Sequence, residues 1–221
     1  VGETPYRQQG VYLLIGGAGG LGLALAEDLV TRFQAKLILI GRSPLDETRQ
    51  RAIAAMGAGN QGEIHYWQAD ATDEQAMQQI WQRAETTVGP VNGVVHGALV
   101  LADRSLRQMD EATLQAALAP KMRAARVLER CLQGRSLDFL AFFSSAQSFL
   151  GNVGQANYAA GCTFMDAWAQ YLAHRCSYPV RVLNWGFWGE TGSVATPEYT
   201  RLLRAKGILP ITTQQGLAAT E

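Results

Sequence analysis

Two hydroxyl groups and one phenol are the side chains of this sequence whose types and spacing suit catalysis. Ser144 and Ser145 end a short apolar run, and Tyr158 follows Ser145 by thirteen residues. A hydroxyl donor beside a phenol suits proton delivery to a carbonyl oxygen, provided that the phenol's ordinary pKa of about 10 is lowered towards neutral. The alternative is a tyrosine packed at the surface, with two serines that satisfy backbone groups at the end of a strand.

The elements around these residues must bring them together. Residues 137–143 are apolar and aromatic, as expected of a strand buried on both faces, and the carboxyl end of a parallel strand opens on the ligand crevice. After a glycine-rich loop, apolar residues recur every four positions from Phe164 to Leu172, which predicts a helix with Tyr158 in its first turn. Ser145 and Tyr158 are therefore expected to converge on one spot.

A glycine-rich turn follows the first predicted strand, residues 11–15. Gly17, Gly19 and Gly22 satisfy G-x-G-x-x-G between that strand and an amphipathic helix. Such glycines permit a tight turn and close backbone approach, and the helix N-terminus offers free N–H groups to a pyrophosphate. The alternative is a glycine-rich turn without a ligand. The residues of this turn expected to bind the cofactor are Gly16, Gly17, Gly19, Gly20, Leu21 and Gly22.

The second predicted strand, residues 36–40, ends in Gly41-Arg42-Ser43. In a dinucleotide-binding fold, an acid at this point favours NAD, whereas an arginine accommodates the 2′-phosphate of NADP. Arg42 therefore predicts NADP. The alternative is an arginine that is simply solvated at the end of a strand.

Residues 64–67 and 91–95 predict the third and fourth strands, and small or polar residues follow each of them. Asp70 is placed either to reach an adenine edge or to cap the helix at residues 74–88. His96, in an apolar strand, is predicted to be a hydrogen-bonded core histidine rather than a metal ligand. The residues expected at the cofactor here are Asp70, Ala71, His96, Gly97 and Ala98.

Residues 110–132 read as a helix, which Pro120 is expected to restart or kink just before Lys121. Lys121 is either a functional residue or a solvated helix lysine, and spacing alone does not decide between the two.

After the sixth predicted strand, residues 180–183, Trp185 and Phe187 lie among glycines. They suit the wall of a substrate site, with packing of a loop as the alternative.

The amphipathic segment at residues 196–206 is predicted to be a mobile lid.

The alternation of strands and helices predicts an α/β fold, namely a Rossmann-type doubly wound parallel sheet in three α/β/α layers with strand order 3-2-1-4-5-6. A length of 221 residues, 48% of them hydrophobic, suits one domain over residues 1–221. The last residues, 214–221, read as the start of a helix, so a last strand is expected to be missing and the chain to be a fragment of a longer polypeptide.

Composition excludes several classes of partner. With 19 acids against 19 bases the net charge is zero, which argues against nucleic acid and anionic membranes. No apolar run is long enough for a membrane span, and no signal peptide is recognisable. Three histidines offer no zinc pattern, and three cysteines lack metal-ligand spacing, which favours a reducing cytoplasm. The cysteines are Cys131, Cys162 and Cys176.

These residues resemble the catalytic half of a ketoreductase domain from a modular polyketide synthase, within the short-chain dehydrogenase/reductase superfamily. In that family the tyrosine lies thirteen residues after a serine and thirty-seven after a lysine, and Tyr158, Ser145 and Lys121 match both spacings. The stretches 157–164 and 184–189 resemble in particular the ketoreductases of trans-acyltransferase systems. The likeness runs from about residue 10 to residue 216.

The resemblance implies NADPH-dependent reduction of a β-ketoacyl thioester, in polyketide biosynthesis, to a β-hydroxyacyl thioester. Tyr158 would deliver the proton, Ser145 would polarise the oxygen, and Lys121 would contact the cofactor's ribose and stabilise the tyrosinate. The implied partners are an acyl carrier protein with its phosphopantetheine-linked chain, an N-terminal structural half and other synthase domains. Cys162 departs from the asparagine of most relatives, so the alternative is a structural domain of a synthase without turnover.

The resemblance also suggests which alcohol is formed. In the family, a Leu-Asp-Asp signature after the fourth strand goes with one direction of substrate entry, and a tryptophan eight residues before the tyrosine goes with the other. Asp103 keeps the last aspartate of that signature, and Leu150 stands at the tryptophan position. The D-configured product is therefore expected. The alternative for Asp103 is a helix cap or a solvated loop acid.

Overall fold

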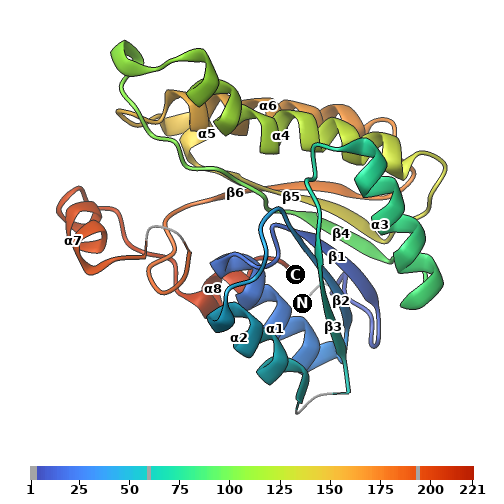
Figure 1. The fold of residues 1–221 in the computed structure, drawn as a ribbon. Helices are drawn as coiled ribbons and strands as arrows, with labels where there is room; N and C mark the ends of the chain where they lie inside the picture. The colour runs from blue at the N-terminus through green and yellow to red at the C-terminus, as the bar shows by residue number, and fades with distance from the viewer. Residues whose placement is uncertain (1–3, 59–60, 193–194) are drawn as a thin grey trace.

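A single parallel sheet organises the chain. The structure is a computed structural model that describes residues 4–58, 61–192 and 195–221. Its six strands run in the order β3-β2-β1-β4-β5-β6, which confirms the predicted Rossmann-type order (Figure 1). The strands are β1 (Val11–Ile15), β2 (Lys36–Gly41), β3 (Glu63–Gln68), β4 (Gly93–His96), β5 (Phe139–Ser145) and β6 (Val180–Trp185).

Helices connect the strands and cover both faces of the sheet (Figure 1). The helices are α1 (Gly20–Phe33), α2 (Glu47–Ala58), α3 (Glu74–Thr87), α4 (Glu111–Leu132), α5 (Gln147–Leu150), α6 (Ala156–Ala173), α7 (Pro197–Ala205) and α8 (Thr213–Ala218), with a short 3-10 turn η1 (Leu106–Gln108). Helices α3, α4 and α6 lie on one face, and α1, α2 and α8 lie on the other (Figure 1).

The core consists of two apolar layers, one on each side of the sheet. Because side chains alternate along a strand, Leu13 and Ile15 of β1 pack towards α3, α4 and α6, while Tyr12 and Leu14 pack towards α1. All four are buried. A strand buried on both faces reads as a continuous apolar run, which is why β1 was recognisable from its sequence.

Three local expectations differ from the structure. The fourth strand begins at Gly93 rather than at residue 91, because the side chain of Asn92 accepts a hydrogen bond from the backbone N–H of Val11 at 2.8 Å. One helix, α4, continues through Pro120, so the expected restart there is wrong, and the expected kink stays a prediction. Asp70 does not cap α3; Asp73 does, by accepting from the N–H of Ala76.

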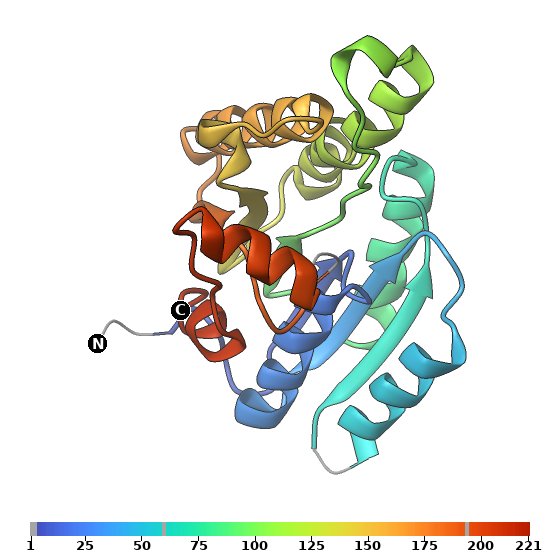
Figure 2. The same cartoon turned by 90° about the vertical axis from the view of Figure 1, so that its left-hand side faces the viewer.

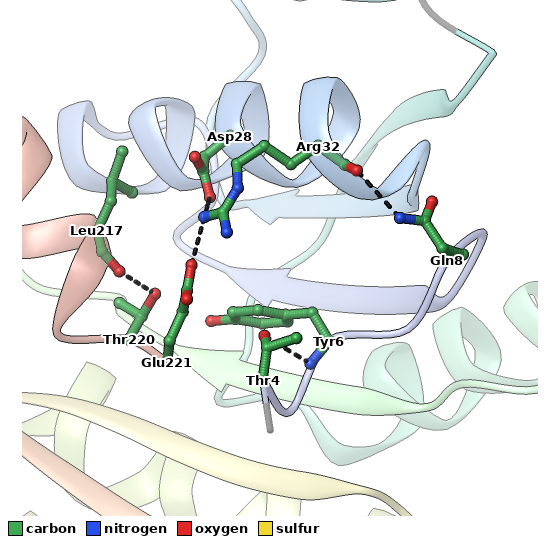
Figure 3. A network of polar contacts seen from close by, with 8 residues as sticks. All are labelled: Thr4, Tyr6, Gln8, Asp28, Arg32, Leu217, Thr220 and Glu221. Atoms are coloured by element: carbon green, nitrogen blue, oxygen red, sulfur yellow. Dashed lines mark hydrogen bonds and ion pairs between the residues drawn. The ribbon is translucent and has the colours of Figure 1, made fainter. Parts of the chain in front are cut away.

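The first and last described residues meet against α1 (Figure 3). Arg32 forms ion pairs with Asp28, at 3.2 Å, and with Glu221. The side chain of Gln8 donates to the carbonyl of Arg32 at 3.2 Å. Burial raises the pKa of Tyr6 to about 12, although a hydrogen bond with Thr220 opposes this shift. The N-terminal and C-terminal segments therefore pack on the same helix.

The helix α7 lies in front of the carboxyl ends of the strands (Figure 2). Its N-cap is Thr196, whose side chain accepts from the N–H of Tyr199, and Pro197 occupies its first turn. Whether α7 moves as a lid stays a prediction. None of the helices in the described ranges is both long enough and apolar enough to span a membrane.

Candidate active site

A cavity of about 580 Å³ opens at the carboxyl ends of the strands. It brings together most of the residues singled out from the sequence. These are Gly16, Gly17, Gly19, Gly20, Leu21, Gly22, Arg42, Asp70, Ala71, Gly97, Ala98, Ser145, Leu150, Tyr158, Trp185 and Phe187. Three predicted residues, His96, Lys121 and Asp103, do not line it directly.

The glycine turn lies where a cofactor's phosphates are expected. Gly16 has a φ of +80°, and a Cβ on Gly22 would lie 2.6 Å from the Cα of Gly17. The N-cap of α1, Gly19, provides no side-chain hydrogen bond, and the first turn of α1 holds no acid. The N-terminal N–H groups of α1 therefore have no side-chain competitor for an anion, so this cradle fits the pyrophosphate of a dinucleotide.

Ser145 and Tyr158 converge in the cavity, as the sequence predicts. The backbone N–H of Gln147 donates to Ser145 Oγ at 3.2 Å, which orients the hydroxyl. Tyr158, half-buried in the first turn of α6, lies close enough to Ser145 for that hydroxyl to lower the pKa of the phenol. The surface-tyrosine alternative is therefore wrong. Ser144 points elsewhere, since its buried hydroxyl donates to the carbonyl of Cys162 at 3.5 Å.

The net effect of the surroundings is to raise the pKa of Tyr158 above its ordinary value. Burial is the largest cause, and Cys162 and Asp103 raise the pKa further, whereas Ser145 lowers it. The chain's own residues thus keep Tyr158 protonated, and they do not supply the lowering that was expected from the sequence. A protonated phenol can still act as a proton donor.

Lys121 lies behind Tyr158 and is only 1% exposed, so it is not a solvated helix lysine. Its Nζ lies 5.3 Å from the centroid of the Tyr158 ring and donates to the carbonyl of Phe143 at 3.4 Å. A Cβ on Gly161 would lie 3.2 Å from Lys121 Cδ, so a small residue at position 161 leaves room for the lysine stem.

Two groups of α6 act on Lys121. Burial lowers the pKa of Lys121, whereas Cys162 and Asp166 raise it. Cys162 is fully buried and influences the pKa of both Lys121 and Tyr158. Asp166 is held by Asn184, whose Nδ2 donates to Asp166 Oδ2 at 2.8 Å. The carboxylate thus offers a fixed negative charge to a lysine that is otherwise buried in apolar surroundings.

His96 lies under the cavity floor rather than in the cavity. Its ring is fully buried and packs edge-on against Phe142, with centroids 5.8 Å apart. Within the described residues, neither ring nitrogen has a hydrogen bond of ordinary geometry, so the prediction of a hydrogen-bonded histidine is wrong. Burial, together with the charge of Lys121, lowers the pKa of His96 to about 3, although a weak interaction with the Pro120 carbonyl opposes this.

Three hydrogen bonds fasten the segment after β4 to the loop before Tyr158. Gln155 Nε2 donates to Asp103 Oδ2 at 2.7 Å, Asn157 Nδ2 donates to the carbonyl of Ala102 at 2.8 Å, and the N–H of Arg104 donates to the carbonyl of Gly154 at 2.8 Å. Asp103 is therefore not a helix cap, but an exposed loop acid that accepts a hydrogen bond from Gln155. It positions Gln155, which lines the cavity.

Aromatic side chains also line the cavity. Trp185 packs edge-on against Phe143 at 5.4 Å, and Phe187 packs against Tyr199 of α7 at 5.3 Å between centroids. Because Tyr199 also lines the cavity, α7 contributes part of this wall. Phe187 therefore faces the cavity as well as packing its own loop.

Sequence reasoning missed several residues that the fold brings to the cavity. Gln155 and Gln147 flank the catalytic candidates without any periodic signal. Arg49 and Tyr66 reach it from α2 and β3, where they read as ordinary surface and strand residues. Only the nearness of Arg49 to Arg42 along the chain offered a hint, since both are cationic and follow the same strand.

The fold and the site together define a Rossmann-fold ketoreductase of the short-chain dehydrogenase/reductase type. Residues 10–190 match the KR domain family, and the chain belongs to that family. The resemblance to polyketide synthase ketoreductases is thereby confirmed.

Known relatives agree with this assignment. The chain is 41% identical over 206 residues to polyketide synthase ThaG of Burkholderia thailandensis, across 93% of this chain and 4% of that protein. It is 37% identical over 222 residues to polyketide synthase PksN of Bacillus subtilis, across 99% of this chain and again 4% of the relative. A ketoreductase domain from the bacillaene assembly line superposes with a TM-score of 0.91 at 35% identity, over 98% of this chain and 54% of that one.

Proposed function

We propose that the chain catalyses NADPH-dependent reduction of a β-ketoacyl thioester, carried on an acyl carrier protein, to the β-hydroxyacyl thioester. The observation that carries this proposal is that Ser145 and Tyr158 line the same cavity as the glycine turn. One end of the cavity suits a dinucleotide, and the other end presents proton donors to a carbonyl oxygen. NADPH supplies the hydride that this reduction adds to the β-carbon.

Ser145 and Tyr158 act on the ketone oxygen in this proposal. As the carbon–oxygen π electrons move onto the oxygen, Ser145 donates a hydrogen bond to the developing charge. Tyr158 transfers its phenolic proton to the oxygen, which completes the alcohol and leaves a tyrosinate. Solvent then returns a proton to the tyrosinate. The raised pKa of Tyr158 keeps the proton in place until the oxygen has gained enough charge to accept it.

Lys121 stabilises the tyrosinate in this scheme. Its ammonium group lies 5.3 Å from the Tyr158 ring, and a positive charge at that range favours the ionised phenol. Asp166 and Cys162 raise the pKa of Lys121 and so help it to keep its charge despite burial. A ribose hydroxyl contact of Lys121 is part of the same proposal.

Arg42 supports NADPH as the cofactor rather than NADH. It lines the cavity just after β2, and Asp70, after β3, is the one acid among the described residues that line the cavity. A guanidinium here would pair with the 2′-phosphate of NADPH, whereas NADH has no 2′-phosphate for it to bind. Ala71, Gly97 and Ala98 would lie along the remainder of the dinucleotide.

The D-configured alcohol is the proposed product. Asp103 is fixed by Gln155, and Leu150, a largely exposed residue, lines the cavity where a tryptophan would narrow it. In this proposal the acyl chain enters the cavity on the α5 side. Trp185 and Phe187 would form the opposite wall of the acyl site.

The proposed partners are the acyl carrier protein, an N-terminal structural half and the other domains of a polyketide synthase. The rival is a structural ketoreductase-like domain without turnover, which the thiol of Cys162 in place of an amide would favour. Loss of NADPH absorbance on mixing the full-length protein with a β-ketoacyl thioester surrogate separates the two. Turnover supports the reductase, and NADPH binding without turnover supports the structural role.

A further inference from the structure

Two side chains of β3 hold the loop that follows β2. Gln68 Nε2 donates to the carbonyl of Arg42 at 3.0 Å, and the hydroxyl of Tyr66 donates to the carbonyl of Ser43. Tyr66 and Gln68 are two positions apart on the strand, so their side chains point to the same face of the sheet. A Cβ on Gly41 would lie 2.5 Å from the Tyr66 hydroxyl, so only glycine leaves this approach open. The loop backbone is thus fixed beside the cavity.

A second arginine reaches the same end of the cavity from α2. Arg49 lines the cavity together with Arg42, Ser43 and Tyr66. The charge of Arg49 also acts on Tyr66, because it lowers the pKa of that phenol against the larger effect of burial, which raises it. Arg49 and the loop after β2 therefore line the same part of the cavity.

Asp46 orients Arg49 without using all of its hydrogen-bonding capacity. Asp46 Oδ1 accepts from the N–H of Arg49 at 2.8 Å, and Oδ2 pairs with Nη1 at 2.7 Å. The side chain of Arg49 is 51% exposed, and the remaining N–H groups of its guanidinium have no acceptor within the described residues. An exposed ion pair of this kind contributes little free energy, so it does not compete strongly with a doubly charged ligand.

Two guanidinium groups at this part of the cavity are available to an anionic ligand. Arg42 forms no ion pair with any residue in the described part of the chain, and Asp70 is already occupied by Thr72, whose N–H and hydroxyl both donate to it at 2.8 Å. Arg42 therefore keeps its whole guanidinium available to a ligand, and Arg49 keeps the N–H groups that Asp46 does not use. Planar guanidinium groups match the oxygens of a phosphate.

We propose that Arg49 is a second ligand of the 2′-phosphate of NADPH, acting together with Arg42, with Tyr66 and Gln68 as the residues that hold the loop for both. This inference rests on the proposed use of NADPH. It names a second residue that increases the preference of the protein for NADPH over NADH. Arg49 is thus a specificity-determining residue rather than a solvated helix arginine.

The test measures binding without turnover. Isothermal titration calorimetry on the full-length protein compares adenosine 2′,5′-bisphosphate with adenosine 5′-monophosphate, which lacks only the 2′-phosphate. Arg49→Gln should weaken the bisphosphate about tenfold and leave the monophosphate within about twofold. The matched control is Arg51→Gln, because Arg51 lies on the same helix and pairs with Glu47 at 2.7 Å but does not line the cavity. It should change neither affinity.

The outcomes separate this inference from the proposed cofactor. If Arg42→Ala removes the preference for the bisphosphate while Arg49→Gln has no effect, NADPH use stands and the role of Arg49 is refuted. Equal weakening of both ligands by Arg49→Gln would also refute it, since a general structural defect does not distinguish them. A wild-type protein without any preference for the bisphosphate would overturn both proposals.

Discussion

His96 offers a prediction whose size follows from the structure. An unfolded histidine has a pKa of about 6.5, whereas in the folded chain burial and Lys121 lower the pKa of His96 to about 3. Between these values the unfolded chain binds a proton that the folded chain does not. Stability should therefore fall as the pH is lowered through this window, and the His96 contribution is fully present only above about pH 6.5.

The shift gives the magnitude. Between about pH 7 and about pH 5, this one linkage should cost about 2 kcal/mol of unfolding free energy. Urea unfolding at the two pH values measures the loss in the wild-type protein and in His96→Gln, whose amide does not titrate. The variant should lose about 2 kcal/mol less than the wild type, whatever its stability at neutral pH.

A second histidine provides the control. His174 is exposed, so His174→Gln should keep the full pH dependence of the wild type. The reasoning is refuted if His96→Gln and the wild type lose the same free energy over this window. In that case the ring of His96 would be able to gain a proton without unfolding.

Three other expectations concern the cofactor, the thiol and the product. Arg42→Ala should raise the KM for NADPH about tenfold and leave that for NADH nearly unchanged, because one charge-assisted phosphate contact contributes about 1.5–3 kcal/mol; steady-state kinetics with both cofactors measures it, and equal effects would contradict it. Cys162→Asn should retain or increase turnover and Cys162→Ser should differ little, since either group can hydrogen-bond to Lys121; complete inactivation by either change would reveal a role for the thiol. Asp103→Ala should erode the stereochemical purity of the alcohol more than the rate, because it releases Gln155; chiral chromatography measures this, and an L-configured wild-type product would contradict the assignment.

Much of the fold could be predicted because local patterns determine it. The apolar strand at residues 11–15, the glycine turn after it and the helix that starts before Tyr158 each occur within a few residues of sequence. The strand order followed from the alternation of strands and helices together with right-handed crossovers. Ser145 and Tyr158 were expected to meet because both lie at the carboxyl edge of the same sheet.

The remaining features depend on contacts between distant residues. The pKa of Tyr158 depends on burial, on Cys162 and on Asp103, which no local pattern reveals. Asp73 rather than Asp70 caps α3, because Asp70 is occupied by Thr72. Arg49 lines the cavity from α2, where it pairs with Asp46. These outcomes are set by side-chain competition that a single sequence does not show.

Transfer of a labelled hydride tests the central claim most directly. The full-length protein is mixed with a β-ketoacyl thioester surrogate and NADPH deuterated at the transferable hydride, and the product is analysed by mass spectrometry. The wild type should place deuterium on the β-carbon of a β-hydroxyacyl thioester. Tyr158→Phe, which keeps the ring but lacks the proton donor, should bind NADPH and form almost no labelled product. Ordinary labelled turnover by Tyr158→Phe, or none by the wild type, would contradict the account.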